Sequence, residues 1–263
     1  MQHLKDTLTI ALMQYPLSWE NPQANRTFFE EKIKAVSTQT DLMILPEMFT
    51  TGFTMNASEN AEMMDGSTVQ WLRRMAKDSS AAITGSIIVK EHGNFFNRLL
   101  FVHPSGKIDH YDKRHLFTLA EEEKTYTAGT HKLIVEYLGW RICPLICYDL
   151  RFPVWSRNVE NYDLLLYVAN WPQMRVTAWD ALLKARAIEN MCYCVGVNRV
   201  GTDGKDFPYS GHSAIYDVFG SQISEDLDEK EGTVLVALQK SHLTENREKF
   251  KFLNDSDSFE IRT

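Results

Sequence analysis

Three residues that could cooperate in covalent chemistry each follow a predicted β-strand. They are Glu47 after residues 41–46, Lys113 after 107–112, and Cys147 after 140–146. Ligands of open α/β sheets collect beyond the carboxyl ends of the strands, so the three side chains could meet at one site. There the carboxylate would take the thiol proton, the sulfur would attack an acyl carbon, and the ammonium would stabilise the oxyanion.

Each of these residues also has a simpler interpretation when it is taken alone. Glu47 could be a solvated loop carboxylate, and Lys113 could do no more than pair with Asp109 or Asp112. Cys147 could be a buried thiol, because free cysteine is among the most buried residue types. Spacing in the sequence does not decide between these interpretations and a shared site.

The cysteines and histidines leave one other thiol mechanism open. The four cysteines are Cys143, Cys147, Cys192 and Cys194, too few for a disulfide scaffold. No CxxC or HExxH motif is present, so we expect no structural zinc site. A papain-like hydrolase pairs cysteine with histidine, and three histidines are eligible by residue type alone: His115, His131 and His212.

Other common catalytic signatures are missing. The sequence has neither the GxGxxG pattern of dinucleotide sites nor the GxxxxGK[ST] pattern of phosphate-binding loops. The GxSxG motif of serine hydrolases is also absent, and residues 211–213 (GHS) are only a fragment of it. Nucleotide-dependent chemistry and a serine nucleophile therefore have no support.

The first part of the chain predicts alternating strands and helices. Leu8, Ile10 and Leu12 alternate with their neighbours as in a strand, and Asn21-Pro22 is a helix start signal. Residues 41–46 form a second short apolar strand. Ser67 and Gln70 have the spacing of a capping box before another helix.

The middle and end of the chain predict hairpins and further βα units. Expected strands cover residues 81–90, 95–103, 107–112, 132–138, 140–147, 163–169, 191–198, 213–219 and 233–239. Expected helices cover 153 to about 160 and 179–189. Pro144 lacks a backbone N–H and indicates an edge or a bulge. This mixture predicts α/β layers with mixed sheets.

Composition points to a single globular domain over residues 1–263. The formal net charge is −7, and the nearest basic cluster, at 113–115, lies among acidic residues, so we expect no nucleic-acid partner. No apolar run approaches a membrane span, and residues 1–6 lack the apolar segment of a signal peptide, so we expect no membrane partner and a cytoplasmic location. Residues from about 247 to 263 form a polar tail with interleaved aromatics that could dock on the core or on a partner subunit.

The chain resembles the nitrilase, or carbon–nitrogen hydrolase, superfamily in three ordered blocks. These are residues 45–49 (LPEMF), 111–117 (YDKRHLF) and 147–153 (CYDLRFP). Further similarity lies at 168–171 (VANW), 185–190 (ARAIEN) and 211–213, and the likeness spans about residues 7–240. Within the superfamily the chain is most similar to the omega-amidase branch.

This resemblance implies a fold and a set of roles. The fold is α/β, a four-layer α-β-β-α sandwich with two mixed sheets that usually forms a homodimer, with no metal or organic cofactor. Glu47 is then the general base, Lys113 the oxyanion-stabilising cation and Cys147 the nucleophile. Many members carry a second glutamate upstream of a glycine. Glu122, seven residues before Gly129, is the match, with Glu121 and Glu123 as alternatives.

The omega-amidase resemblance also implies a substrate, a small-molecule amide such as 2-oxoglutaramate or 2-oxosuccinamate. The backbone N–H of Tyr148 would assist Lys113 at the oxyanion. Arg151 could bind the substrate carboxylate, because arginine binds carboxylates bidentately, or it could be a structural ion-pair partner. Phe117 and Trp171 could form the walls of the pocket. A nitrilase, an N-carbamoyl hydrolase and a non-catalytic binding protein remain alternatives.

Overall fold

The computed structural model describes residues 4–261 and contains two large β-sheets, which pack face to face. The strands of the first sheet, in spatial order, are β13 (Gly232–Gln239), β1 (Thr7–Gln14), β2 (Leu42–Ile44), β3 (Ala82–Glu91), β4 (Asn94–Val102) and β5 (Ile108–Asp112). Those of the second are β12 (Ala214–Tyr216), β9 (Tyr193–Val197), β8 (Leu164–Val168), β7 (Trp140–Ile146) and β6 (Val135–Tyr137). A separate ribbon pairs β10 (Val200–Thr202) with β11 (Pro208–Ser210).

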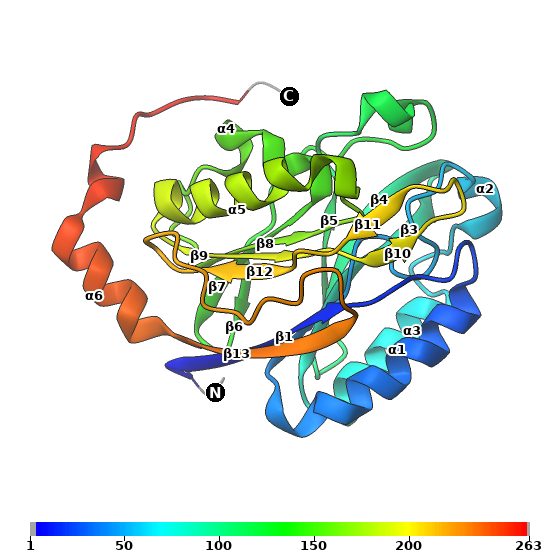
Figure 1. Cartoon of the computed structure of the whole chain (residues 1–263), viewed down its shortest axis with the longest axis horizontal. Helices are drawn as coiled ribbons and strands as arrows, with labels where there is room; N and C mark the ends of the chain where they lie inside the picture. The colour runs from blue at the N-terminus through cyan, green and yellow to red at the C-terminus, as the bar shows by residue number, and fades with distance from the viewer. Residues whose placement is uncertain (1–3, 262–263) are drawn as a thin grey trace.

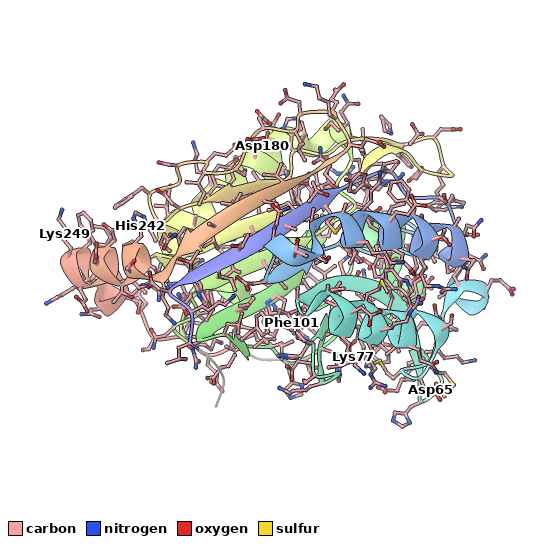
Figure 2. The ribbon with its side chains drawn as sticks, turned by 90° about the horizontal axis from the view of Figure 1, so that it is seen from below. Asp65, Lys77, Phe101, Asp180, His242 and Lys249 are labelled. Carbon is pink, nitrogen blue, oxygen red and sulfur yellow. The ribbon has the colours of Figure 1, made fainter. Side chains whose placement is uncertain are left out.

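Helices cover the outer faces of both sheets (Figure 1). The α-helices are α1 (Pro22–Val36), α2 (Ala57–Asn60), α3 (Ser67–Ser79), α4 (Pro153–Ser156), α5 (Val176–Asn190) and α6 (Lys240–Phe250). The 3-10 turns are η1 (Ser37–Gln39), η2 (Thr118–Ala120), η3 (Glu122–Lys124), η4 (Cys147–Arg151), η5 (Gln173–Arg175) and η6 (Phe252–Asp255). In Figure 2 α1 and α3 lie side by side over the first sheet, and α6 extends from the far end of the molecule. No helix within residues 4–261 is long and apolar enough to cross a membrane.

Each sheet combines parallel and antiparallel pairing. β1, β2 and β3 run parallel, as do β7, β8 and β9, and the outer strands of both sheets pair antiparallel. The predicted four-layer α-β-β-α sandwich with two mixed sheets is therefore confirmed. Because the parallel strands of each sheet end at the same edge, residues that follow them can gather there.

The side chains of β1 show why its sequence is apolar on both faces. Ile10 and Leu12 point into the core between the two sheets, whereas Ala11 and Met13 pack against the layer of α1 and α3. Successive side chains of a strand point to opposite faces, so a strand that is covered on both sides needs apolar residues at every position.

One helix start follows the sequence prediction and the other does not. The Asn21 side chain accepts a hydrogen bond from the N–H of Ala24 at 3.1 Å and caps α1. The predicted capping box of Ser67 and Gln70 is wrong, because α3 has no hydrogen bond of that kind. Instead, Glu62 from the preceding loop accepts from the N–H of Thr68 at 2.7 Å and supplies the negative charge that a helix start favours.

Pro144 lies at a local edge, as its missing N–H predicts. β7 pairs with β8 along Ile142–Ile146, whereas β6 pairs only with residues 140–142. Beyond Ile142 the β6 side of the strand has no ladder to interrupt, and proline is tolerated there.

Several segments of the structure differ from the sequence prediction. The strand expected at 132–138 is shorter, at Val135–Tyr137, and the helix expected from Pro153 to about 160 ends at Ser156. The helix stops because the N–H of Asn158 is donated to the Asn190 side chain, at 2.8 Å, instead of to a helical carbonyl. α6 also differs from the prediction, because no helix is predicted over its residues.

The C-terminal segment passes over the α4 and α5 side of the molecule (Figure 1). α6 is fastened by Arg247, which donates to the carbonyls of Met191 at 2.7 Å and Tyr162 at 2.6 Å. Farther along, Phe259 lines a shallow hollow with Val154. The predicted tail thus begins inside a helix, and its last two residues, 262 and 263, lie outside the described residues.

Candidate active site

The structure brings Glu47, Lys113 and Cys147 to one cavity, at the ends of strands from both sheets. The Nζ of Lys113 lies 3.0 Å from Oε1 of Glu47, and both side chains are buried. The thiol of Cys147 lies beside the Glu47 carboxylate, which perturbs its pKa directly. The carboxylate, ammonium and thiol groups thus meet at one point, although they are far apart in the sequence.

Glu122 completes this charged cluster. Its Oε1 and Oε2 accept from the Nζ of Lys113 at 3.0 and 2.9 Å, and the N–H of Phe117 donates to Oε2 at 2.6 Å. Glu121 and Glu123 are exposed instead. The backbone of Glu121 is left-handed, with φ 56°, between η2 and η3, and this turn directs only the central glutamate inward.

Two asparagines extend the cluster. The Nδ2 of Asn97 donates to Oε1 of Glu47 at 2.8 Å and reaches Oε1 of Glu122 at 3.5 Å. The N–H of Asn170 donates to Oε2 of Glu47 at 2.8 Å. Neither asparagine was predicted from the sequence to have a role at the site. Two usable signals were the buried position of Asn97 within the largely apolar strand β4 and the position of Asn170 two residues after the end of β8.

The backbone presents Cys147 at a sharp turn between β7 and η4. Its φ is 43°, a left-handed conformation that costs a non-glycine residue energy and occurs often at functional sites. Met48, next to Glu47, has a φ of 41°. A short turn after a strand exposes the side chain at the sheet edge, so the sulfur faces the cavity despite its buried surroundings.

Asp149 fixes this turn to the loop that follows Lys113. Its carboxylate accepts from the N–H of Ile146 at 3.0 Å, the hydroxyl of Tyr111 at 2.8 Å and the N–H of His115 at 3.0 Å. These bonds join the chain on either side of the sulfur to the chain on either side of the ammonium. Asp149 therefore holds the two functional groups in a fixed relation.

Electrostatics keep the thiol protonated in the resting site. Burial raises the pKa of Cys147 well above its usual value, the Glu47 carboxylate raises it further, and Lys113 offsets only part of the increase. Lys113 does favour the thiolate, but burial and Glu47 outweigh it, and the helix that follows, α4, is only a single turn. A base is therefore needed when the sulfur attacks.

The charges of the cluster depend on one another. Burial alone would lower the pKa of Lys113, but Glu122 and Glu47 raise it above its usual value, so the lysine is an ammonium ion. Burial raises the pKa of Glu122; Lys113 lowers it, and Glu47 raises it again. The cluster thus holds two carboxyl groups for one ammonium.

The cavity that Glu47, Lys113 and Cys147 line has a volume of about 390 Å³. All four residues predicted to contact the substrate line it, namely Phe117, Tyr148, Arg151 and Trp171. The guanidinium carbon of Arg151 lies 4.9 Å from the centre of the Trp171 ring. No ion pair or guanidinium hydrogen bond of Arg151 is present within the described chain, so its interpretation as a structural ion-pair partner has no support there.

The histidine alternative lacks a suitable geometry. Among residues 4–261 no histidine lines the cavity. His115 contacts Asp149 at 2.8 Å, His212 contacts Asp180 and His131 contacts the Thr130 hydroxyl, and within the described residues none of the three has a hydrogen bond to Cys147. Residues 4–261 also contain no group of three or more His, Cys, Asp or Glu side chains arranged to hold a metal ion.

Known proteins are similar in sequence to this chain over nearly its whole length. The family model for carbon–nitrogen hydrolases matches residues 9–248. Omega-amidase YafV of Escherichia coli strain K12 is 46% identical over 255 residues, which cover 97% of this chain and 98% of that protein. The 2-oxoglutaramate amidase of Bacillus subtilis strain 168 is 33% identical and covers 94% of this chain, with 96% of its own length matched.

The fold of the whole chain has a solved counterpart. The crystal structure of a carbon–nitrogen hydrolase superfamily protein from Xanthomonas campestris, which carries an arsenic adduct in its active site, superposes with a TM-score of 0.96. It is 44% identical, with 98% of this chain and 100% of that chain covered. The family match and the near full-length relatives agree, and the chain belongs to the carbon–nitrogen hydrolase family.

Proposed function

We propose that this protein is an omega-amidase. It hydrolyses the terminal amide of 2-oxo acids such as 2-oxoglutaramate and 2-oxosuccinamate to the 2-oxo dicarboxylate and ammonia. The observation that carries the proposal is the contact of Lys113 with Glu47, beside Cys147, in a cavity that is also lined by Arg151, an arginine with no ion pair among residues 4–261. The YafV and 2-oxoglutaramate amidase relatives support this choice within the family.

The first step transfers the thiol proton to Glu47 as the sulfur attacks the amide carbon. Oε1 of Glu47 already accepts from Lys113 and Asn97, whereas Oε2 accepts only from the N–H of Asn170. A carboxylate oxygen has two lone-pair sites, so Oε2 has room for the proton. The raised pKa of Cys147 requires proton transfer to accompany the attack.

The resulting oxyanion is stabilised by Lys113 and by the backbone N–H of Tyr148. Two carboxylates hold the ammonium in place where it lines the cavity, so its positive charge is available to the oxyanion. Glu122 acts as the positioning residue for Lys113. Preorganised donors of this kind typically contribute about 3 kcal/mol each to lowering the barrier.

The tetrahedral adduct collapses when Glu47 returns its proton to the amide nitrogen. The carbon–nitrogen bond breaks, ammonia leaves and the acyl group remains on Cys147 as a thioester. A water molecule then gives a proton to Glu47 and adds to the thioester carbon. When this second adduct collapses, the sulfur leaves with the proton, and the 2-oxo dicarboxylate is released.

Arg151 binds the carboxylate of the substrate in this proposal. Its guanidinium group faces the cavity and has a flat, bidentate donor edge that matches a carboxylate. Tyr148, Phe117 and Trp171 enclose the rest of the substrate. A simple nitrile has no carboxylate for a cation of the cavity to bind. N-carbamoyl amino acids do have one, and between these and the omega-amides the YafV and 2-oxoglutaramate amidase relatives favour the omega-amides.

We further propose that the chain is one domain that acts as a homodimer in the cytoplasm. Exposed apolar residues on and beside α4 and α5, Val154, Val159 and Ile188, suit a contact with a second copy, to which the C-terminal tail could contribute. Four free thiols suit a reducing compartment. Sedimentation analysis of the purified chain and fractionation of its source cells test these points; a monomer or a secreted protein would overturn them.

The function is tested by comparing three substrate classes side by side. Nitriles, N-carbamoyl amino acids and 2-oxo acid omega-amides are supplied to the purified protein and product is measured. We expect the omega-amides to have the highest kcat/KM, with turnover lost in Cys147→Ala and retained in Cys143→Ala. A preference for either other class, or an active Cys147→Ala, would refute the proposal.

A further inference from the structure

A second arginine, Arg175, faces the same cavity as Arg151. It stands at the end of η5, between β8 and α5, and belongs to none of the sequence blocks that indicate the family. Within residues 4–261 its guanidinium group, like that of Arg151, has no hydrogen bond and no ion pair. Both arginines are half-buried, and a half-buried cation without a partner gains most from an anion that comes from outside the chain.

Aromatic rings hold both guanidinium groups in place. The guanidinium carbon of Arg175 lies 5.1 Å from the centre of the Phe117 ring, and that of Arg151 lies 4.9 Å from the centre of the Trp171 ring. The indole N–H of Trp171 also donates to the backbone carbonyl of Arg175 at 2.8 Å. One tryptophan therefore supports the first arginine and anchors the backbone of the second, and stacking leaves the donor edge of each guanidinium free.

The other charges of the cavity do not occupy these arginines. Asp203 lines the cavity, but its carboxylate accepts from the N–H groups of Lys205 and Phe207 at 2.8 and 3.0 Å and from the Tyr209 hydroxyl at 2.9 Å. Glu47 is engaged by Lys113. The arginines thus have no competing carboxylate inside the cavity.

Two groups of charged residues line the cavity. Glu47 and Lys113 are buried with Glu122, whereas Arg151 and Arg175 are only half-buried. A substrate with a carboxylate at one end and a neutral amide at the other is attracted to the guanidinium groups by its carboxylate. The amide end then reaches the sulfur.

We propose that Arg175 and Arg151 together form the subsite for the 2-oxo acid end of the substrate. The geometry points to two guanidinium groups that share the carboxylate and the adjacent oxo oxygen, so that the enzyme recognises the end opposite the scissile amide. This inference rests on the proposed omega-amidase function and deepens it. Arg175 is a specificity-determining residue that contacts the substrate away from the reacting carbon.

The test is a substrate pair measured on several full-length variants. The substrates are 2-oxoglutaramate and butyramide, a linear amide without a carboxylate, and the variants are Arg175→Met, Arg175→Lys and Arg151→Met. Methionine keeps apolar contact with Phe117 but removes the charge. Arg141→Met is the matched control, because Arg141 is a half-buried arginine near the opposite end of β7 from Cys147, paired with Glu136.

For Arg175→Met we expect kcat/KM on 2-oxoglutaramate to fall about 10- to 100-fold, which is the range for loss of hydrogen bonds to a charged group. The change should appear mainly in KM, because the contact is present in both the ground state and the transition state. Activity on butyramide should not change. Arg175→Lys should recover part of the loss, and Arg141→Met should behave as the unmodified protein.

The outcomes separate this inference from the function on which it rests. If the unmodified protein does not prefer 2-oxoglutaramate to butyramide, the proposed function fails. If it does, but Arg175→Met keeps the same preference, the two-arginine subsite is refuted and the function stands. Equal losses on both substrates would show that Arg175 only supports the fold of the cavity, and would also overturn the inference.

Discussion

Replacing Glu122 with glutamine tests whether a second buried carboxylate is needed to position Lys113. Both of its oxygens are fully engaged: Oε1 accepts from Lys113 and Asn97 at 3.0 and 3.5 Å, and Oε2 accepts from Lys113 and the N–H of Phe117 at 2.9 and 2.6 Å. In glutamine one of these oxygens becomes an NH₂ donor. Whichever way the glutamine amide is oriented, Lys113 loses one of its two acceptors on residue 122. In addition, the new NH₂ group faces another donor, which is either the Asn97 side chain or the N–H of Phe117.

The size of the effect follows from these two lost hydrogen bonds. Hydrogen bonds to charged groups contribute roughly 1.5–3 kcal/mol each, so the lower value gives about 3 kcal/mol for the pair. Each 1.36 kcal/mol corresponds to a tenfold change in rate, and kcat on 2-oxoglutaramate should fall about 100-fold. The assay is ammonia release at saturating substrate, together with circular dichroism to confirm that the variant is folded.

The neighbouring glutamates provide matched controls. Glu121→Gln and Glu123→Gln change the same residue type in the same turn, but both side chains are exposed, and Glu121 pairs only with the exposed Lys124. Both variants should keep their kcat. A folded Glu122→Gln protein with nearly unchanged kcat would show that Lys113 is positioned without Glu122 and would refute this reasoning.

Three further predictions follow from the burial and hydrogen bonding of particular groups. Iodoacetamide should label Cys147 alone in the native protein, because the three other thiols are fully buried; peptide mass spectrometry that finds Cys143 labelled first would contradict this. The free energy of unfolding should fall above about pH 9, because burial raises the pKa of Cys192 to about 12, so the fold retains a proton that the unfolded chain releases. This loss is about 1 kcal/mol between pH 9 and 10 for one such thiol, and urea unfolding of Cys192→Ala should show a smaller loss over that interval. Asn97→Leu removes a 2.8 Å donor that orients Glu47 and should lower kcat/KM about tenfold, the value of one hydrogen bond to a charged group, whereas an unchanged kcat/KM in the folded variant would mean that Asn97 only fills space.

Much of the site could be predicted because its residues follow strands whose sequences are distinctive. β2 and β7 are buried on both faces, so their apolar runs end visibly at the residues before Glu47 and Cys147. For the second glutamate of the site, the sequence left three adjacent candidates, residues 121–123, of which Glu122 was the match. The deciding factor is the left-handed backbone at Glu121, a conformation that a run of identical residues does not reveal.

Other features depend on contacts that no local pattern encodes. Asn97 reaches Glu47 because β4 pairs antiparallel with β5, which brings Asn97 beside the N–H of Lys113. Arg175 faces the cavity because Trp171 anchors its carbonyl. α6 has little apolar periodicity, and Arg247 fixes it to carbonyls at the ends of other elements. These are tertiary interactions, and only the assembled fold reveals them.

The central claim is that Cys147 forms a covalent acyl intermediate assisted by Glu47 and Lys113. The most direct measurement is to stop the reaction with 2-oxoglutaramate by rapid acid quenching during turnover and to map the protein by peptide mass spectrometry. The account predicts the substrate acyl group as a thioester on the peptide that contains Cys147, and no adduct in Cys147→Ala. An acyl group on a different residue, or rapid ammonia release by Cys147→Ala, would contradict it.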